Sequence, residues 1–327
     1  MIKVNIDYES VLFHSQVGPK GINEYLEFLA FFIQDDVILT TKKYSQDYLD
    51  YVGRISGVAP KTQEAGTAEN WWGPLKDLNQ ERLLNSKLNS TDLAISQGWV
   101  EAQILDSHLE SYSDDFFFKD PYSMSGKGFR STADAKHIKK FPQILERKLH
   151  RKFDFSHYVL PDGQTIAYAN VVDEKFQYKG SEFLDWKHAT VENLSFYKEV
   201  SPFRWKEFQE RLEIIKSHYQ VSNNFGYSID SFIYEENGEL LIYPLCEVNY
   251  RRTMGRVAYE LSEKYASHKK ITKLVLTKAK KDFYKEFTRE GVIVLSPGDA
   301  RFELIFFMAD TMEELTASLK ACDRDLK

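Results

Sequence analysis

Two turn signals constrain the fold of this chain more than any other feature of its sequence. Asp162-Gly163 and Asn237-Gly238 each separate two runs that are rich in β-branched and aromatic residues. Such dipeptides favour the tight turns that join antiparallel strands. The predicted strands around the two turns cover residues 155–160, 164–172, 227–234 and 239–245. The sequence therefore predicts two β-hairpins in this part of the chain.

The N-terminal part of the chain has a different pattern. Residues 25–32 and 44–55 have helical spacing, and the β-branched run 36–41 between them predicts a strand. A helix, a buried strand and a second helix favour a small α/β unit with a parallel sheet. Residues 62–70 are rich in Gly, Thr, Ala and Asn and are expected to form the loop that leaves this unit.

Further elements complete a mixed α/β pattern. Helices are expected at residues 88–97, 201–220, 253–265 and 311–321. Strands are expected at residues 115–119, 143–146, 273–276, 292–295 and 302–307, and a loop-like segment at residues 170–180. A chain of 327 residues is long enough for two or three lobes, so the fold class is α/β with α+β lobes.

The composition excludes several classes of protein. The net charge of −6 is spread along the chain, whereas a nucleic-acid-binding protein needs a basic face. No apolar run reaches the length of a signal peptide or a membrane span. Cys246 and Cys322 lack the spacing of a zinc site or a disulfide framework. We expect a cytoplasmic protein without nucleic-acid or membrane partners, and a homodimer stays open.

A loop of small residues follows the strand that ends at Lys119. It contains residues whose backbone can approach a phosphate closely, namely Ser123, Ser125, Gly126, Lys127 and Gly128. The loop is not a P-loop, because Pro121 and Gly128 stand where that motif needs Gly and Ser or Thr. A phosphate-binding loop and an ordinary surface turn are both compatible with these residues.

The second predicted hairpin carries a set of oxygen donors. Asp230 lies on its first strand, and Glu247 and Asn249 follow on the second. Residues two apart on a strand face the same side, and carboxylate and amide oxygens are the ligands that Mg²⁺ prefers. Acids in such apolar strands need a partner, which a metal could supply. A polar strand edge is an equally good interpretation.

Arg251 follows these donors directly, in the segment Tyr250-Arg251-Arg252-Thr253-Met254-Gly255. An arginine beside a metal–phosphate site would neutralise a transferring phosphoryl group or bind a substrate carboxylate. An arginine pair at a helix start could also be a surface feature that forms salt bridges.

The order of these motifs resembles that of the ATP-grasp superfamily over residues 85–256. In that family a lysine ends a strand before a Ser/Gly loop, and a hinge that reads adenine, an acidic ribose ligand and a set of metal ligands follow. The resemblance implies that ATP and two Mg²⁺ ions bind, with Mn²⁺ as an alternative ion. The residues that it implies for the nucleotide are Lys87, Lys119, Ser123, Ser125, Gly126, Lys127, Gly128, Glu146, Leu149 and Asp154. The implied metal ligands are Asp230, Glu247 and Asn249, and the implied catalytic residues are Arg251 and Lys119.

The resemblance also implies a domain organisation and a reaction. Residues 1–84 would form a pre-ATP-grasp α/β domain, residues 85–190 a central lid lobe with the nucleotide loop, and residues 191–327 a metal-binding lobe. The implied activity is that of an ATP-dependent ligase, which activates a carboxylate as an acyl phosphate for attack by an amine. Its substrates would be small molecules or peptides that carry these groups. Two alternatives keep the fold, a kinase that phosphorylates a small molecule and a nucleotide-binding module without catalysis.

Overall fold

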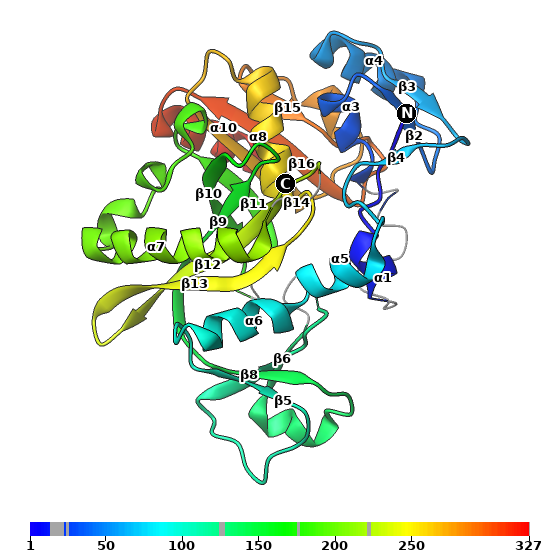
Figure 1. Cartoon of the computed structure of the whole chain (residues 1–327). Coiled ribbons are helices and arrows are strands. Elements are labelled where there is room, and N and C mark those ends of the chain that lie inside the picture. Colours follow the sequence, from blue (N-terminus) through cyan, green and yellow to red (C-terminus); the bar gives the residue numbers. More distant parts are fainter. Residues whose placement is uncertain (14–22, 24–25, 124–127, 175–176, 221–223, 327) are drawn as a thin grey trace.

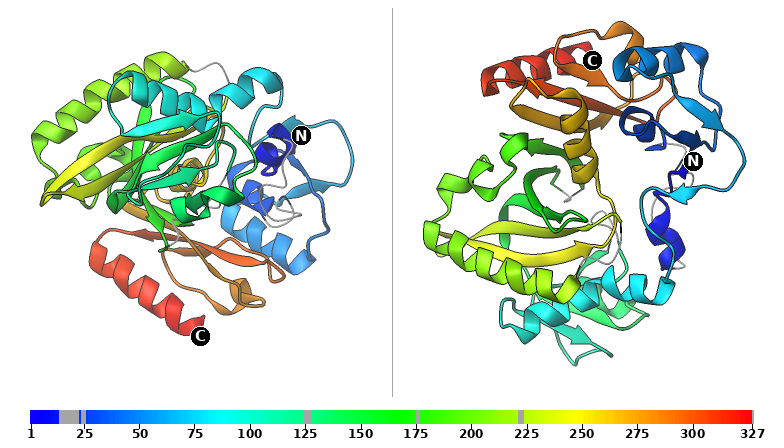
Figure 2. Two further views of the ribbon diagram at one scale, coloured as in Figure 1. Left: turned by 90° about the horizontal axis from the view of Figure 1, so that it is seen from below. Right: turned by 45° about the horizontal axis from the view of Figure 1, so that its top comes forward.

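Three β-sheets organise the part of the chain that the structure describes (Figure 1). The computed structural model describes residues 1–13, 23, 26–123, 128–174, 177–220 and 224–326. In Figure 1 and in the right view of Figure 2, the N-terminal sheet lies beside the C-terminal strands, and a small sheet of central residues lies at the other end. The mixed α/β class expected from the sequence is confirmed.

The N-terminal sheet is parallel, as predicted, with the strand order β3-β2-β1-β4. Its strands are β1 (Ile2–Lys3), β2 (Val37–Leu39), β3 (Lys61–Gln63) and β4 (Glu69–Asn70). The expectation of a plain loop at residues 62–70 is wrong, because β3 and β4 extend into this range. These strands are short and polar, so neither propensity nor alternation marks them in the sequence.

Helices attach the N-terminal sheet to the rest of the chain. They are α1 (Tyr8–Leu12), α3 (Leu29–Ile33), α4 (Gln46–Ser56) and α5 (Leu78–Leu84). The Tyr51 hydroxyl on α4 donates a 2.9 Å hydrogen bond to the Val294 carbonyl, and the buried Tyr48 hydroxyl donates to the Leu295 carbonyl. Both aromatic rings are buried in a core that continues into the C-terminal strands, so this lobe shares its hydrophobic core with the large sheet.

The small central sheet is antiparallel, with the order β5-β8-β6-β7. Its strands are β5 (Ala102–Leu105), β6 (Phe116–Lys119), β7 (Phe129–Ser131) and β8 (Gln143–Arg147), and the 3₁₀ helix η1 (Thr132–His137) follows β7. Leu105, Phe118 and Leu145 belong to a separate small core. Helix α6 (Lys87–Ser96) precedes the sheet and confirms the helix expected at residues 88–97.

The large sheet contains eight strands in the order β13-β12-β9-β10-β11-β14-β16-β15. Its strands are β9 (His150–Val159), β10 (Thr165–Val172), β11 (Tyr178–Phe183), β12 (Tyr227–Glu236), β13 (Glu239–Asn249), β14 (Ile271–Lys278), β15 (Val292–Val294) and β16 (Phe302–Ala309). Both predicted hairpins are confirmed, since β9 pairs with β10 and β12 with β13 in antiparallel register. The loop expected at residues 170–180 is wrong at its end, where β11 begins, because pairing with β10 and β14 outweighs its polar sequence.

The remaining helices begin where the sequence provides caps. They are α7 (Pro202–Tyr219), α8 (Met254–Tyr265), α9 (Phe283–Glu286) and α10 (Met312–Asp325), with 3₁₀ turns η2 (Trp186–His188), η3 (Val191–Asn193) and η4 (Tyr197–Glu199). The Ser201, Thr253 and Thr311 side chains accept hydrogen bonds from backbone N–H groups in the first turns of α7, α8 and α10. The three helices expected in this region are therefore confirmed.

The chain changes sheets between Arg147 and His150. The boundary expected at residue 190 lies between β11 and β14, which pair in antiparallel register within the large sheet. The large sheet thus contains strands from both sides of that boundary. The division of the chain into three lobes stays a prediction. No helix among the described residues has the length and apolar character that crossing a membrane requires.

The contact between Gly255 and Tyr168 provides a test of this packing. A Cβ atom at Gly255 would lie 2.0 Å from the Cζ atom of the buried Tyr168 ring, so the start of α8 has no room for a side chain. We expect Gly255→Ala to lower the free energy of unfolding by about 1–3 kcal/mol in urea titrations. The matched control is Gly53→Ala, whose Cβ would meet its nearest neighbour at 3.4 Å inside α4. This control should be neutral or stabilising by up to about 1 kcal/mol, and equal effects of both substitutions would contradict the packing.

Candidate functional site

The predicted site residues gather where the small sheet, the large sheet and the N-terminal lobe meet. Asp230 and Glu247 lie directly opposite each other on the paired strands β12 and β13. Asn249 ends β13, and Lys119 ends β6 of the small sheet. Lys87 starts α6. Residues that are far apart in sequence therefore contribute charged side chains to one region.

Lys87 connects the predicted nucleotide loop to β13. Its Nζ atom lies 2.7 Å from Glu247 Oε2, and it also donates to the Ser123 carbonyl oxygen. Ser86 caps α6, since its Oγ atom accepts a 3.1 Å hydrogen bond from Leu88 N. This cap fixes the helix start and, with it, the position of Lys87 at the site.

Lys119 is a buried cation, with only 1% of its side chain exposed. Its Nζ atom lies 3.4 Å from Glu146 Oε2 and 2.9 Å from the Cys246 carbonyl oxygen. Burial by itself disfavours the charged form, but Cys246, Glu146 and Glu247 outweigh it and raise the pKa of Lys119. Lys119 therefore stays positively charged inside the protein.

Asp230 and Glu247 form a pair of opposed carboxylates. Burial and the Glu247 charge raise the pKa of Asp230, although the Ser156 and Ser228 hydroxyls donate to Oδ1 at 2.7 and 2.8 Å. Burial would also raise the pKa of Glu247, but the ammonium groups of Lys87 and Lys119 lower it well below its usual range. Two like charges that face each other favour a cation between them.

Asn249 completes the predicted metal set. Its Nδ2 atom donates to Asp230 Oδ2 at 2.9 Å, and its Oδ1 atom accepts from Arg251 Nη2 at 3.0 Å. In the part of the chain that the structure describes, no group of three His, Cys, Asp or Glu side chains could hold a metal ion. The predicted set consists of two carboxylates and one amide, and carboxylate and amide oxygens are the type of ligand that Mg²⁺ prefers.

Arg251 joins this set to the N-terminal lobe. Its Nη2 atom donates to Glu9 Oε1 at 2.8 Å, and its guanidinium carbon lies 5.6 Å from the centre of the Trp72 ring. Burial opposes its charge, but Glu9 outweighs this effect and raises the pKa of Arg251. Glu9 is not among the predicted site residues, because a single acid on a five-residue helix gives no spacing signal.

The predicted adenine and ribose residues lie where the chain passes from β8 of the small sheet to β9 of the large sheet. Glu146 is buried and paired with Lys119, and the Leu149 carbonyl accepts a 3.0 Å hydrogen bond from Arg151 N. Asp154 forms an ion pair with Arg151. The Arg151 guanidinium carbon lies 4.3 Å from the centre of the Phe232 ring, so the predicted ribose acid belongs to a cluster of charged and aromatic side chains.

An aromatic pair beside this cluster was not predicted. Phe232 and Tyr243 lie opposite each other on β12 and β13, and their ring centroids are 4.5 Å apart with an angle of 8° between the planes. The available signal was an aromatic residue on each strand of a predicted hairpin. Both rings are buried, and they stack against each other beside Arg151.

The predicted phosphate loop is only partly within the described residues. Ser125, Gly126 and Lys127 lie outside them. At the ends of the loop, the Gly128 carbonyl accepts a 3.0 Å hydrogen bond from Asp120 N, and the Ser123 hydroxyl donates to the Asp120 carbonyl at 3.0 Å. A Cβ atom at Gly128 would lie 2.1 Å from Ser123 Oγ, so this position has no room for a side chain.

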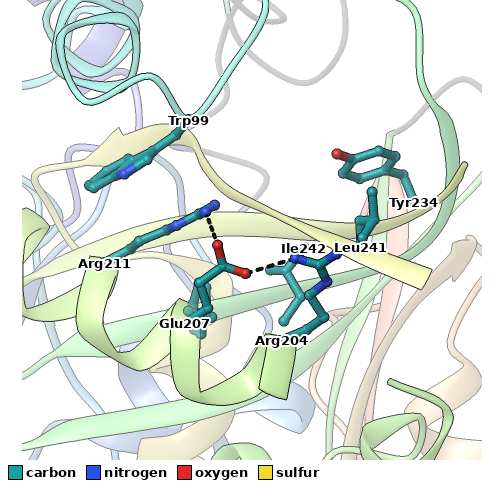
Figure 3. A pocket seen from close by; sticks show the side chains of 8 residues that line it. Trp99, Arg204, Glu207, Arg211, Tyr234, Leu241 and Ile242 are labelled. Carbon is teal, nitrogen blue, oxygen red and sulfur yellow. Dashed lines mark hydrogen bonds and ion pairs between the residues drawn. The ribbon is translucent and has the colours of Figure 1, made fainter. Parts of the chain in front are cut away.

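Two cavities lie outside this set of residues. A cavity of about 140 Å³ between α7 and the β12–β13 hairpin contains Glu207, which bridges Arg204 at 3.1 Å and Arg211 at 2.5 Å (Figure 3). A cavity of about 460 Å³ is lined by residues 39–43 with Lys3 and Glu64. No predicted site residue lines either cavity, and the arginines of the first are already paired with Glu207. The candidate site is therefore the charged junction of the lobes.

Comparisons with known proteins identify similar folds. No protein-family model matches the chain, and no curated protein matches its sequence. N5-carboxyaminoimidazole synthetase from Staphylococcus aureus superposes with a TM-score of 0.53 at 12% identity, covering 98% of this chain and 96% of that one. The corresponding ribonucleotide synthetase from Thermotoga maritima gives 0.53 at 11% identity, with 90% and 95% covered. A β-γ-ATP complex of biotin carboxylase from Campylobacter jejuni gives 0.50 at 11%, with 98% and 84% covered.

The buried pair of Lys119 and Glu146 gives a testable consequence for stability. Removing one partner leaves the other charge buried without compensation, which typically costs about 3–5 kcal/mol. We expect Lys119→Met to lower the free energy of unfolding by about this amount, and the double substitution Lys119→Met with Glu146→Gln to recover much of it. Urea unfolding of the two single variants and the double variant measures the coupling. Additive effects would show that the two side chains do not interact.

Proposed function

We propose that this chain, which has the ATP-grasp fold, is an ATP-dependent ligase that joins a carboxylate to an amine. One observation carries the proposal. Three cations, Lys87, Lys119 and Arg251, converge on the opposed carboxylates Asp230 and Glu247 at the junction of the lobes. This set of charges suits a triphosphate with its metal ions better than it suits an uncharged substrate.

Lys87 and Lys119 would bind the phosphates of ATP. Lys87 is paired with Glu247, and Lys119 is paired with Glu146. Phosphate oxygens would replace these carboxylates in part as partners of the two lysines. Asp230, Glu247 and Asn249 would hold two Mg²⁺ ions, or Mn²⁺ in their place. When bound, these ions offset the charge of the triphosphate and orient it.

The remaining nucleotide residues keep the roles that the resemblance implies. Glu146, Leu149 and Asp154 would contact adenine and ribose, and the loop that includes Ser125, Gly126 and Lys127 would cover the phosphates. The similar solved structures support this assignment at the level of the fold, and the C. jejuni carboxylase among them was solved as a β-γ-ATP complex.

The proposed chemistry needs positioning and charge stabilisation rather than a protein nucleophile. A carboxylate is a poor electrophile, because its leaving group would be an oxide. Transfer of the γ-phosphoryl group to the carboxylate oxygen gives an acyl phosphate. The amine nitrogen then attacks the acyl carbon, the bond to phosphate breaks, and the nitrogen loses a proton. Arg251 would stabilise negative charge on the transferring phosphoryl group and on the tetrahedral intermediate.

The proposed substrates are small molecules or peptides that carry a carboxylate and an amine. We also propose that the protein acts in the cytoplasm, because Cys246 and Cys322 are free thiols, as expected in a reducing compartment. A homodimer is compatible with this proposal. Nothing in the site calls for nucleic acid or a membrane as partner.

A screen for ATP-dependent phosphate release tests the proposal. Amino acids and small peptides are tested in pairs, with one member of each pair as the carboxylate substrate and the other as the amine substrate. The masses of the products identify the bond that forms. We expect ADP and phosphate to appear only with a suitable pair, together with a product joined by loss of water. Phosphate found on a small-molecule product would favour a kinase, and ATP binding without turnover for any pair would favour a non-catalytic module.

Glu247 is the residue to test within that assay. We expect Glu247→Gln to lower turnover by about 100-fold or more, because it removes a metal ligand and the partner of Lys87. The matched control is Glu207→Gln, which also removes a carboxylate paired with a cation, but on α7 outside the candidate site. The control should keep its activity, and circular dichroism should show both variants folded. Comparable turnover in the two variants would contradict the assignment.

Chelation tests the proposed role of Mg²⁺ without turnover. A nucleotide that binds only the folded protein raises the free energy of unfolding by about 2.7 kcal/mol at a concentration of about 100 times its Kd. We expect ATP with Mg²⁺ to raise Tm in thermal unfolding, and EDTA to remove most of that increase. An equal increase in EDTA would show that the carboxylate set does not bind a metal with the nucleotide.

A further inference from the structure

Glu9 is a buried carboxylate that the proposed phosphoryl transfer does not use. It lies on α1, and its side chain is 9% exposed. Its Oε1 atom accepts the 2.8 Å hydrogen bond from Arg251. Its Oε2 atom is buried and has no hydrogen-bond partner among the described residues. A buried carboxylate oxygen without a donor is costly, so a ligand that donates there would stabilise the site.

Other buried carboxylates of the same region have their donors within the chain. Glu81 accepts from the Tyr8 hydroxyl at 2.7 Å and from three backbone N–H groups. Glu27 accepts from Thr41 and from the Tyr44 hydroxyl. The open oxygen of Glu9 is therefore a local feature of the junction with Arg251, and not a general property of this lobe.

The charges at the junction favour a cation at this oxygen. The carboxylates are those of Glu9, Glu146, Asp230 and Glu247, and the cations are Lys87, Lys119 and Arg251. Two Mg²⁺ ions and the triphosphate of ATP largely offset each other, so the four carboxylates exceed the three cations, and the substrate carboxylate adds a further negative charge. A ligand with a positive charge would balance this set.

We propose that Glu9 binds the amine of the acceptor substrate through Oε2, and that this acceptor is a primary amine that arrives as an ammonium ion. The proposal rests on the ligase function above. Arg251, which would hold the acyl group, donates to the other oxygen of the same carboxylate. An ammonium on Oε2 therefore lies beside the acyl group. It transfers one proton to this carboxylate and then attacks as the free amine, so Glu9 selects amines over neutral acceptors.

The competing role for Glu9 is to position Arg251 alone. Glu9→Gln separates the two roles, since its amide keeps an oxygen for Arg251 but lacks the charge that attracts an ammonium. Two reactions are measured with the pair found in the screen. One is amide formation as a function of amine concentration, and the other is hydroxamate formation with hydroxylamine, an uncharged nucleophile that traps the acyl phosphate. Glu27→Gln is the matched control, because it removes a buried carboxylate of the same lobe that has no contact with Arg251.

We expect Glu9→Gln to raise the KM of the amine about tenfold or more, with hydroxamate formation within about fivefold of the wild-type rate. Glu9→Asp should restore part of the amine affinity, and Glu27→Gln should leave this KM unchanged. If Glu9→Gln slows amide and hydroxamate formation equally and leaves the KM of the amine unchanged, Glu9 does not bind the amine. That result would assign Glu9 to positioning Arg251. If wild-type protein forms no hydroxamate with any carboxylate, the ligase function fails, and the role of Glu9 fails with it.

Discussion

The contacts of Arg251 and Arg252 with the N-terminal lobe hold the candidate site together. Arg252 N donates to the Trp72 carbonyl at 2.8 Å, and its guanidinium carbon lies 4.5 Å from the centre of the Trp71 ring. Arg251 reaches Glu9 from the same side. Both arginines directly follow the strand that carries Glu247 and Asn249, so these contacts fix the end of β13 against the N-terminal lobe. Together with the hydrophobic core that the lobe shares with the large sheet, they place Glu9 beside the acids of that sheet.

Paired charges explain how such a site stays folded before a ligand arrives. Lys87 pairs with Glu247 and Lys119 with Glu146, both largely out of contact with water. Buried ion pairs are weak sources of stability, because desolvation offsets most of their attraction. Their concentration at one junction therefore points to function rather than to folding. On binding, ligand phosphates would replace the carboxylates as partners of the two lysines, and metal ions would replace the lysines as partners of the carboxylates. The charged side chains would then need to move only a little.

Local signals account for the part of the structure that could be predicted. The Asp-Gly and Asn-Gly turns fix both hairpins, and the hairpin register then places Asp230 opposite Glu247. The order of the lysines and acids supported the ATP-grasp resemblance. Glu9 and the stacked rings of Phe232 and Tyr243 could not be identified, because their meaning depends on contacts between lobes or across strands. Strand β11 was missed in part because its neighbours, rather than its own residues, stabilise it.

The path of one oxygen atom tests the ligase mechanism most directly. An acyl phosphate forms when a carboxylate oxygen attacks the γ-phosphorus, and that oxygen leaves with the phosphate when the amine attacks. A carboxylate labelled with ¹⁸O should therefore transfer one labelled oxygen to the released phosphate, which mass spectrometry detects. Unlabelled phosphate formed together with the amide would contradict an acyl phosphate, and a phosphoryl group retained on the product would show a kinase.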